Sequence, residues 1–149
     1  MELTIDAKAF TDLLALPARA IPSRPSRPIL GSLLLKAGEG SLAVTATDEV
    51  VIITTNTEAS VDRHGEICLP AKLLNDMVSR MEGVVHLNWD ADTSQATLTS
   101  LGSTYTISGH SGDDYPLVER AEGTTLTLAA TTMAEALSST LVTASTDEG

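Results

Sequence analysis

The 149-residue sequence has one cysteine, few aromatic residues and no long hydrophobic run. The single thiol, Cys68, excludes an intramolecular disulfide framework and fits a reducing compartment. Aromatic residues make up 3% of the chain, so aliphatic side chains and methionine must supply most of the core. No apolar segment approaches the roughly 20 residues that span a bilayer, and the amino terminus lacks a secretory signal pattern. We therefore expect a folded cytoplasmic protein with no membrane partner.

Basic residues are also scarce, because nine lysines and arginines stand against 20 acidic residues and give a net charge of −11. Phosphate binding depends on lysine and arginine, so the total charge counts against a nucleic-acid partner. Most of the basic residues nevertheless fall in or beside two predicted helices, whereas most acids lie in strand ends, turns and the tail. A basic surface can therefore still form locally.

Motifs that carry catalysis are missing. His64, His86 and His110 are scattered, and the segment 109–112 is not a Gly-x-Ser-x-Gly turn. There is no glycine-rich phosphate loop, and no histidine or cysteine pair has metal-ligand spacing. The segment 90–92 hints at a calcium loop but lacks the required glycine and closing glutamate, so a hairpin turn explains it better. We expect no catalytic residues, no metal and no cofactor, and hence a protein that is not an enzyme.

The same order of elements occurs twice before about residue 110: a strand, a helix and three strands. Alternation and turn residues place the strands at 3–5, 29–36, 41–47 and 50–57 in the first copy, and at 66–69, 84–90, 95–100 and 103–108 in the second. A charged loop at 62–65 separates the copies. The chain therefore carries an internal repeat.

Each copy contains one amphipathic helix. Asp6 is placed to cap the first helix, and Pro17 is expected to end it near Leu16. The second helix is predicted over 71–81. Its apolar face comprises Leu73, Leu74, Met77, Val78 and Met81, and its polar face comprises Lys72, Asn75, Asp76, Ser79 and Arg80. The polar faces are either a solvated surface or a weakly basic face for a nucleic-acid backbone.

The connector between the first helix and the next strand, residues 21–28, is stiff and positively charged. Three prolines alternate with Arg24 and Arg27 and then give way to an apolar run. Proline fixes its own φ and restricts the preceding residue, so the two guanidinium groups have a limited range of positions. An anionic partner is the natural expectation.

A partial third repeat follows the second copy. We expect the first domain to cover residues 1–118, a linker 119–123, and a truncated second domain 124–149 with one strand at 126–128 and one helix. The helix has capping-box spacing at Thr132 and Glu135 and an apolar stripe of Met133, Leu137 and Leu141. One strand and one helix cannot bury their apolar faces alone, so either the sequence continues or the tail docks on another copy.

Several segments, taken in order with the duplicated pattern, resemble a known family. They are the opening strand and helix, 23–30 leading into 33–35, 46–48, 69–72 and 114–116. Together they look like the first domain of the bacterial sliding clamp, the beta subunit of DNA polymerase III. The similarity covers the whole chain, including the start of a second domain after Gly123. Two residues depart from the family pattern. Pro17 lies where the first helix of the family normally continues, and Glu49 occupies a position that is often apolar in clamps.

The resemblance implies an α+β DNA clamp domain of two β-α-β-β-β units, with antiparallel sheets outside and two helices on the inner face of a ring. It implies a processivity factor that encircles double-stranded DNA, contacts its phosphate backbone without regard to sequence, and tethers the replicative polymerase. Other clamp subunits are implied partners; polymerase and clamp loader are expected for the full-length parent but not for this fragment. The alternative is a short clamp-like protein that self-associates as an interaction module without closing a ring.

The resemblance also implies site residues. Arg24 and Lys72 match DNA-contacting positions of the family, while Lys8, Arg80, Asn75 and Ser79 are inferred from helical face only. The subunit interface is expected at the strand 103–108, through Tyr105 and Ile107. For that pair, an ordinary place in the core is the alternative.

Overall fold

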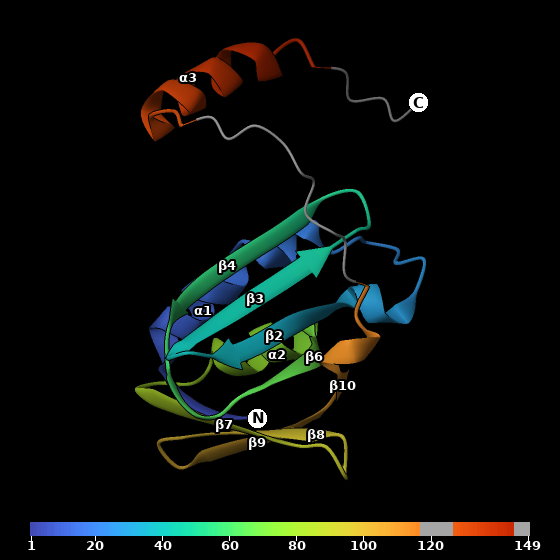
Figure 1. Ribbon diagram of the computed structural model, residues 1–149, viewed down its shortest axis with the longest axis vertical. Helices are drawn as coiled ribbons and strands as arrows, with labels where there is room; N and C mark the ends of the chain where they lie inside the picture. The colour runs from blue at the N-terminus through green and yellow to red at the C-terminus, as the bar shows by residue number, and fades with distance from the viewer. Residues whose placement is uncertain (117–126, 145–149) are drawn as a thin grey trace. The chain divides into compact units, whose positions relative to one another are not determined.

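The computed structural model describes residues 1–116 and 127–144 (Figure 1). The chain divides into two compact units, Met1–Val118 and Glu119–Gly149. Among the described residues, no helix is long and apolar enough to cross a membrane.

The first unit contains the predicted repeat of a strand, a helix and three strands. The first copy consists of β1 (Glu2–Asp6), α1 (Ala7–Ala15), β2 (Ser32–Gly38), β3 (Ser41–Thr47) and β4 (Ile52–Glu58). After β5 (Ser60–Arg63), the second copy consists of β6 (Gly65–Pro70), α2 (Ala71–Val78), β7 (Val84–Asp90), β8 (Gln95–Ser100) and β9 (Ser103–Ser108), followed by β10 (His110–Ser111). This arrangement confirms the predicted α+β fold of two β-α-β-β-β units.

The strands form two five-stranded sheets, in the orders β5-β1-β7-β8-β9 and β10-β6-β2-β3-β4. Every neighbouring pair is antiparallel. Each copy places its first strand in the sheet of the other copy, because β1 pairs with β7 and β6 pairs with β2. The two copies are therefore interlocked and form one unit.

Both predicted features of α1 are confirmed. The Asp6 side chain caps the helix by accepting a hydrogen bond from the Ala9 amide at 3.0 Å. The helix ends at Ala15 with Leu16 as its C-cap, and Pro17 opens the 3₁₀ turn Pro17–Ala20. Proline suits that first position because its missing amide hydrogen has no partner to lose there.

Two segments differ from the prediction. The segment 62–65, expected as a charged loop, contributes to β5 and β6, and Leu3 and Val61 are partners in the pairing of β1 with β5. The strand expected from Ile29 begins at Ser32, because Pro28–Gly31 form a 3₁₀ turn. Both differences have tertiary causes, since the β1 edge recruits β5 and the connector needs a turn before it enters the sheet.

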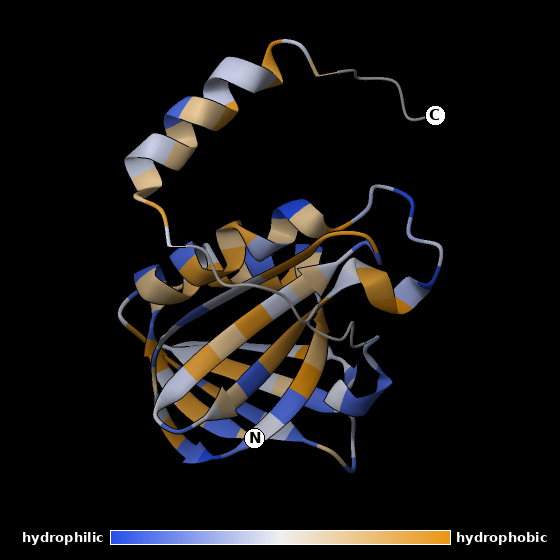
Figure 2. Cartoon of the chain, turned by 45° about the horizontal axis from the view of Figure 1, so that its top comes forward, coloured by the Kyte–Doolittle hydropathy of each residue, from blue (hydrophilic) through white to orange (hydrophobic). Residues whose placement is uncertain are grey.

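The core lies between the two sheets and the two helices. Hydrophobic positions alternate with hydrophilic ones along the strands in Figure 2, and β7 alternates buried and exposed residues over its whole length. Phe10 and Leu14 from α1, Leu74 from α2 and Leu33 of β2 are all fully buried in one core cluster. The core is mainly aliphatic, as the composition predicts.

The second helix differs from the prediction in the exposure of one leucine and in its last residue. Leu73, assigned to the apolar face, is 49% exposed, because Ala71, Leu74 and Val78 hold the buried side of α2. The helix stops at Val78 rather than Met81, although the Met81 side chain is buried.

The described part of the second unit contains one helix, α3 (Ala130–Leu141). Its N-cap is Ala129, which makes no side-chain cap, so the predicted capping box at Thr132 and Glu135 is wrong because Thr132 lies inside the helix. The expected linker 119–123 and Leu126 lie outside the described residues, and Thr127 and Leu128 belong to no strand.

The neighbouring residues Leu73 and Leu74 allow a matched test of this packing. Leu74→Ala removes a fully buried side chain and should lower the free energy of unfolding by about 2–5 kcal/mol. Leu73→Ala, at a 49% exposed position, should cost about 1 kcal/mol or less. Urea denaturation of both variants measures the difference, and equal losses would contradict the assigned orientation of α2.

Candidate nucleic-acid interface

The two helices of the first unit pack side by side. Figure 1 shows both on the same face of the sheet that contains β2, β3 and β4. The Thr55 hydroxyl of β4 donates to the Leu13 carbonyl of α1 at 2.8 Å and attaches that helix to the sheet. The sides of α1 and α2 that point away from the core therefore form one surface, which we call the helix face.

On α1, the helix face carries a cation that is already paired. Lys8 lies 2.6 Å from Asp12, one turn further along, and the two side chains are 83% and 65% exposed. The hydrogen bond that Lys8 donates to the Asp12 carboxylate raises the pKa of Lys8. The charge of Lys8 is thus largely balanced within its own helix, which weakens it as an anchor for a phosphate.

On α2, the two cations are exposed at opposite ends of the helix. Lys72 lies in the first turn, where the helix dipole also favours an anion, and Arg80 follows the last turn. The structure gives neither of them an acidic partner among the residues it describes. Lys72 and Arg80 are therefore the available cations of the helix face.

The two polar residues predicted alongside them are less available. Ser79 is exposed, but its hydroxyl donates to the Asp76 carbonyl at 3.2 Å. Asn75 is half-buried. Ser79 is the C-cap residue of this short helix.

The connector separates its two arginines into different roles. Arg24 is exposed and, within the described part of the chain, has no acidic partner. Arg27 instead forms an ion pair with Glu49. No local pattern predicts this pair, because Glu49 lies 22 residues from Arg27 and only the folded β3–β4 turn brings it to the connector.

The strand predicted as a subunit interface, β9, is the last strand of its sheet. Ile107 is 3% exposed and belongs to the core, and Tyr105 is half-buried against that core. The structure thus places both side chains on the core side of β9. Among the described strands, β9 pairs only with β8, so its other backbone edge has no partner strand. Thr104 and Thr106 lie on the exposed face of β9.

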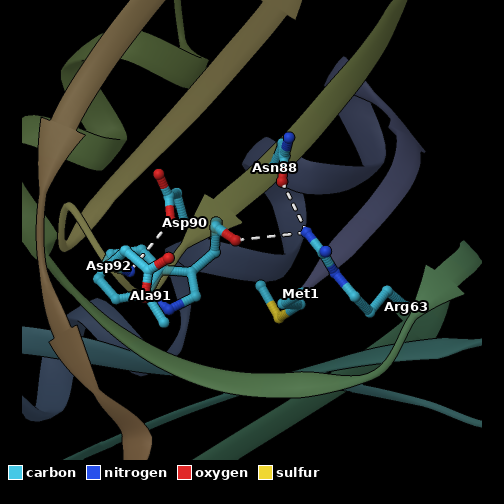
Figure 3. Close-up of a pocket in the computed structure, with 7 residues that line it drawn as sticks. Met1, Arg63, Asn88, Asp90, Ala91 and Asp92 are labelled. Carbon is cyan, nitrogen blue, oxygen red and sulfur yellow. Dashed lines mark hydrogen bonds between the residues drawn. The ribbon is translucent and has the colours of Figure 1, made fainter.

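A shallow hollow of about 510 Å³ lies at the Met1 end of β1, the end opposite α1 (Figure 3). Arg63 donates there to the Asn88 side chain at 3.0 Å and to the Trp89 carbonyl at 3.5 Å. Burial, and then the Arg63 charge, lower the pKa of the Met1 amine. Asp90 accepts hydrogen bonds from its own turn, so the hairpin explanation of residues 90–92 is sound.

The described residues contain no cluster of three or more histidine, cysteine or acidic side chains that could hold a metal. Cys68 is buried, and this burial raises the pKa of its thiol to about 12. At neutral pH the thiol is therefore protonated and a poor nucleophile.

Comparison with known proteins agrees with this geometry. Residues 1–119 match the family model of the DNA polymerase III beta subunit, N-terminal domain. The beta sliding clamp of Synechococcus elongatus is 39% identical over 153 residues, which cover 99% of this chain and 40% of that protein. The beta sliding clamp of Synechocystis sp. is 40% identical over 157 residues, with the same coverage of 99% and 40%.

Solved structures of sliding clamps have the same fold. A Caulobacter crescentus beta sliding clamp superposes with a TM-score of 0.76 at 27% identity, over 80% of this chain and 32% of that one. The beta subunit from DNA polymerase of Streptococcus pyogenes reaches a TM-score of 0.79 at 21% identity, over 84% and 34%. The chain spans about 40% of the length of the curated relatives it matches. It belongs to the DNA polymerase III beta subunit family and contains the N-terminal domain of that family.

Proposed function

We propose that this chain supplies one DNA-facing domain of a sliding clamp, a non-enzymatic processivity factor that encircles duplex DNA and tethers the replicative polymerase. The observation that carries the proposal is the helix face. Two helices from the two copies of the repeat lie side by side and expose Lys72 and Arg80, with Arg24 exposed on the connector. Membership of the beta subunit family supports the same role.

The chemistry of the helix face suits contact without sequence recognition. Lysine and arginine side chains bind phosphate oxygens, which are the same at every base pair. The face also carries acids, since Asp12 neutralises Lys8 and Asp76 lies exposed on α2. A few cations interspersed with acids bind the DNA backbone weakly. The domain can therefore move along the duplex, while the closed ring keeps the protein from dissociating.

Ring formation requires other clamp subunits, and the edge of β9 is our candidate surface for that contact. An edge strand presents unpaired backbone donors and acceptors to a partner strand. In this proposal Tyr105 and Ile107 support the edge from the core side, and the backbone of β9 makes the pairing. Polymerase and clamp loader are proposed partners of a full-length clamp rather than of these 149 residues.

Single substitutions test the helix face. Lys72→Ala and Arg24→Ala should each weaken binding of the chain to a short duplex and reduce the slope of log affinity against log salt by about 0.9 per lost phosphate contact. Lys36→Ala is the matched control, because Lys36 is an exposed lysine of β2 paired with Glu66 at 2.5 Å. Fluorescence anisotropy over a range of salt concentrations measures the slopes.

The same variants should keep their folding free energy within about 0.5 kcal/mol, because they change exposed side chains. Equal effects of Lys36→Ala and Lys72→Ala would mean that overall charge, not the helix face, governs binding. A loss of cooperative unfolding in Lys72→Ala or Arg24→Ala would assign those residues a structural role instead.

A second prediction concerns topology. A recombinant chain limited to these 149 residues should dissociate from nicked circular DNA in high salt, because weak phosphate contacts are screened when no closed ring retains the protein. Gel filtration of the mixture before and after a salt wash measures retention. Salt-resistant retention on circular DNA that is lost when the DNA is linearised would show that the chain closes a ring by itself.

A further inference from the structure

Two side chains of the proline-arginine connector bind the same glutamate, Glu49. The Ser26 hydroxyl donates to one carboxylate oxygen of Glu49 at 3.2 Å, and the Arg27 guanidinium donates to the other. Two consecutive connector residues, between Pro25 and Pro28, therefore use both oxygens of one side chain. We call this arrangement the Glu49 clasp.

The turn that carries Glu49 is ordered by its own hydrogen bonds. Glu49 has a left-handed backbone, with φ of 79°, and its amide donates to the Thr47 hydroxyl at 2.9 Å. The Asp48 carboxylate accepts from the Val50 amide at 2.9 Å and from the Val51 amide at 2.6 Å. These bonds lower the pKa of Asp48, so the carboxylate stays charged and the turn stays closed at neutral pH.

This turn is fixed to the buried part of the sheet. Thr47 is 1% exposed, and its amide donates to the Tyr115 hydroxyl at 3.1 Å. That hydroxyl donates in turn to the Ser32 carbonyl at 3.4 Å, where β2 begins after the connector. The Glu49 carboxylate thus projects from a rigid base, and the connector is the more adaptable partner in the clasp.

Holding Ser26 and Arg27 also restricts Arg24. Only Pro25 stands between Arg24 and Ser26, and a proline both fixes its own φ and disfavours the helical region for the residue before it. Arg24 therefore has few backbone conformations once Ser26 is held. Its guanidinium is exposed and has no acidic partner among the described residues, so it is available to a ligand while its backbone is restrained.

We propose that Glu49 is a positioning residue for Arg24: by clasping Ser26 and Arg27 it orders the connector and presents the Arg24 guanidinium to a DNA phosphate. This inference rests on the proposed function. The proposal also accounts for an acidic residue beside a segment proposed to bind DNA, because the Glu49 carboxylate is neutralised by its ion pair with Arg27.

The sign of one effect separates this role from simple repulsion. If Glu49 only repelled DNA or withheld Arg27 from it, Glu49→Gln would strengthen binding by removing a negative charge and freeing that cation. If Glu49 positions Arg24, Glu49→Gln should weaken duplex binding by about two- to fivefold, the range expected for loss of one exposed ion pair. Arg24→Ala should then cost less in the Glu49→Gln background than in the parent chain.

Glu39→Gln is the matched control. Glu39 is also an exposed glutamate with a left-handed backbone, φ 48°, but it lies in the turn between β2 and β3. Its substitution changes the net charge by the same amount and should leave the dependence on Arg24 intact. The charge-reversed pair Glu49→Arg with Arg27→Glu keeps the parent net charge and should recover binding that Glu49→Arg alone loses.

Backbone order in the free chain gives a readout that does not involve DNA. Nitrogen-15 relaxation of the Arg24, Ser26 and Arg27 amides should show increased fast motion in Glu49→Gln, parental order in Glu39→Gln, and restored order in the charge-reversed pair. Unchanged connector order in Glu49→Gln, or stronger DNA binding by that variant, would overturn the proposal.

The two hypotheses fail in different ways. If Arg24→Ala and Lys72→Ala bind duplex DNA as the parent does, the DNA-binding role of the helix face is wrong, and the relaxation data alone still decide whether Glu49 orders the connector. If those variants weaken binding while Glu49→Gln changes neither binding nor connector order, the proposed function stands and the positioning role of Glu49 is wrong.

Discussion

The exchange of first strands between the two copies of the repeat is the constraint on which the rest of the first unit depends. β1 pairs with β7, and β6 pairs with β2, so neither sheet is complete without a strand from the other copy. Each of these strands leads directly into a helix, since Asp6 ends β1 and caps α1, and Pro70 ends β6 before α2. The exchange therefore fixes where both helices start and brings them side by side.

The helix face follows from that placement, and its charge pattern is compatible with the proposed contact with DNA. A net charge of −11 describes the whole chain, but phosphate binding depends on the few cations of one surface. Lys72 and Arg80 are available there, whereas Lys8 is paired with Asp12 and Arg27 with Glu49. The ion pairs thus determine which cations are available to bind a phosphate. Only a few exposed cations of the described residues remain unpaired.

Local sequence signals were sufficient for much of this fold. Strict alternation placed the strands 41–47, 84–90, 95–100 and 103–108 with the bounds that the structure has. Asp6 and Pro17 marked the ends of α1 because capping and proline chemistry act within one turn. The DNA-contacting roles expected of Arg24 and Lys72 rest on family resemblance and stay predictions, and the structure adds that both side chains are exposed.

The features that sequence reasoning missed depend on contacts between distant segments. β5 is a strand because the edge of β1 is there to pair with it, which no local pattern in 60–63 encodes. Leu73 looked equivalent to Leu74, but only the packing direction of α2 decides which of the two is buried. Glu49 was noted only as a departure from the family pattern, and its meaning appears when the β3–β4 turn meets the connector.

The central claim is that the helix face and the connector, rather than the outer surfaces of the sheets, contact duplex DNA. Paramagnetic broadening of the chain's amide signals by a spin-labelled duplex of mixed sequence tests this most directly. The account predicts broadening around Lys72, Arg80 and Arg24 and little at Thr45 and Thr54, which pair across β3 and β4. Broadening centred on β3 and β4, with the α2 signals unaffected, would contradict it.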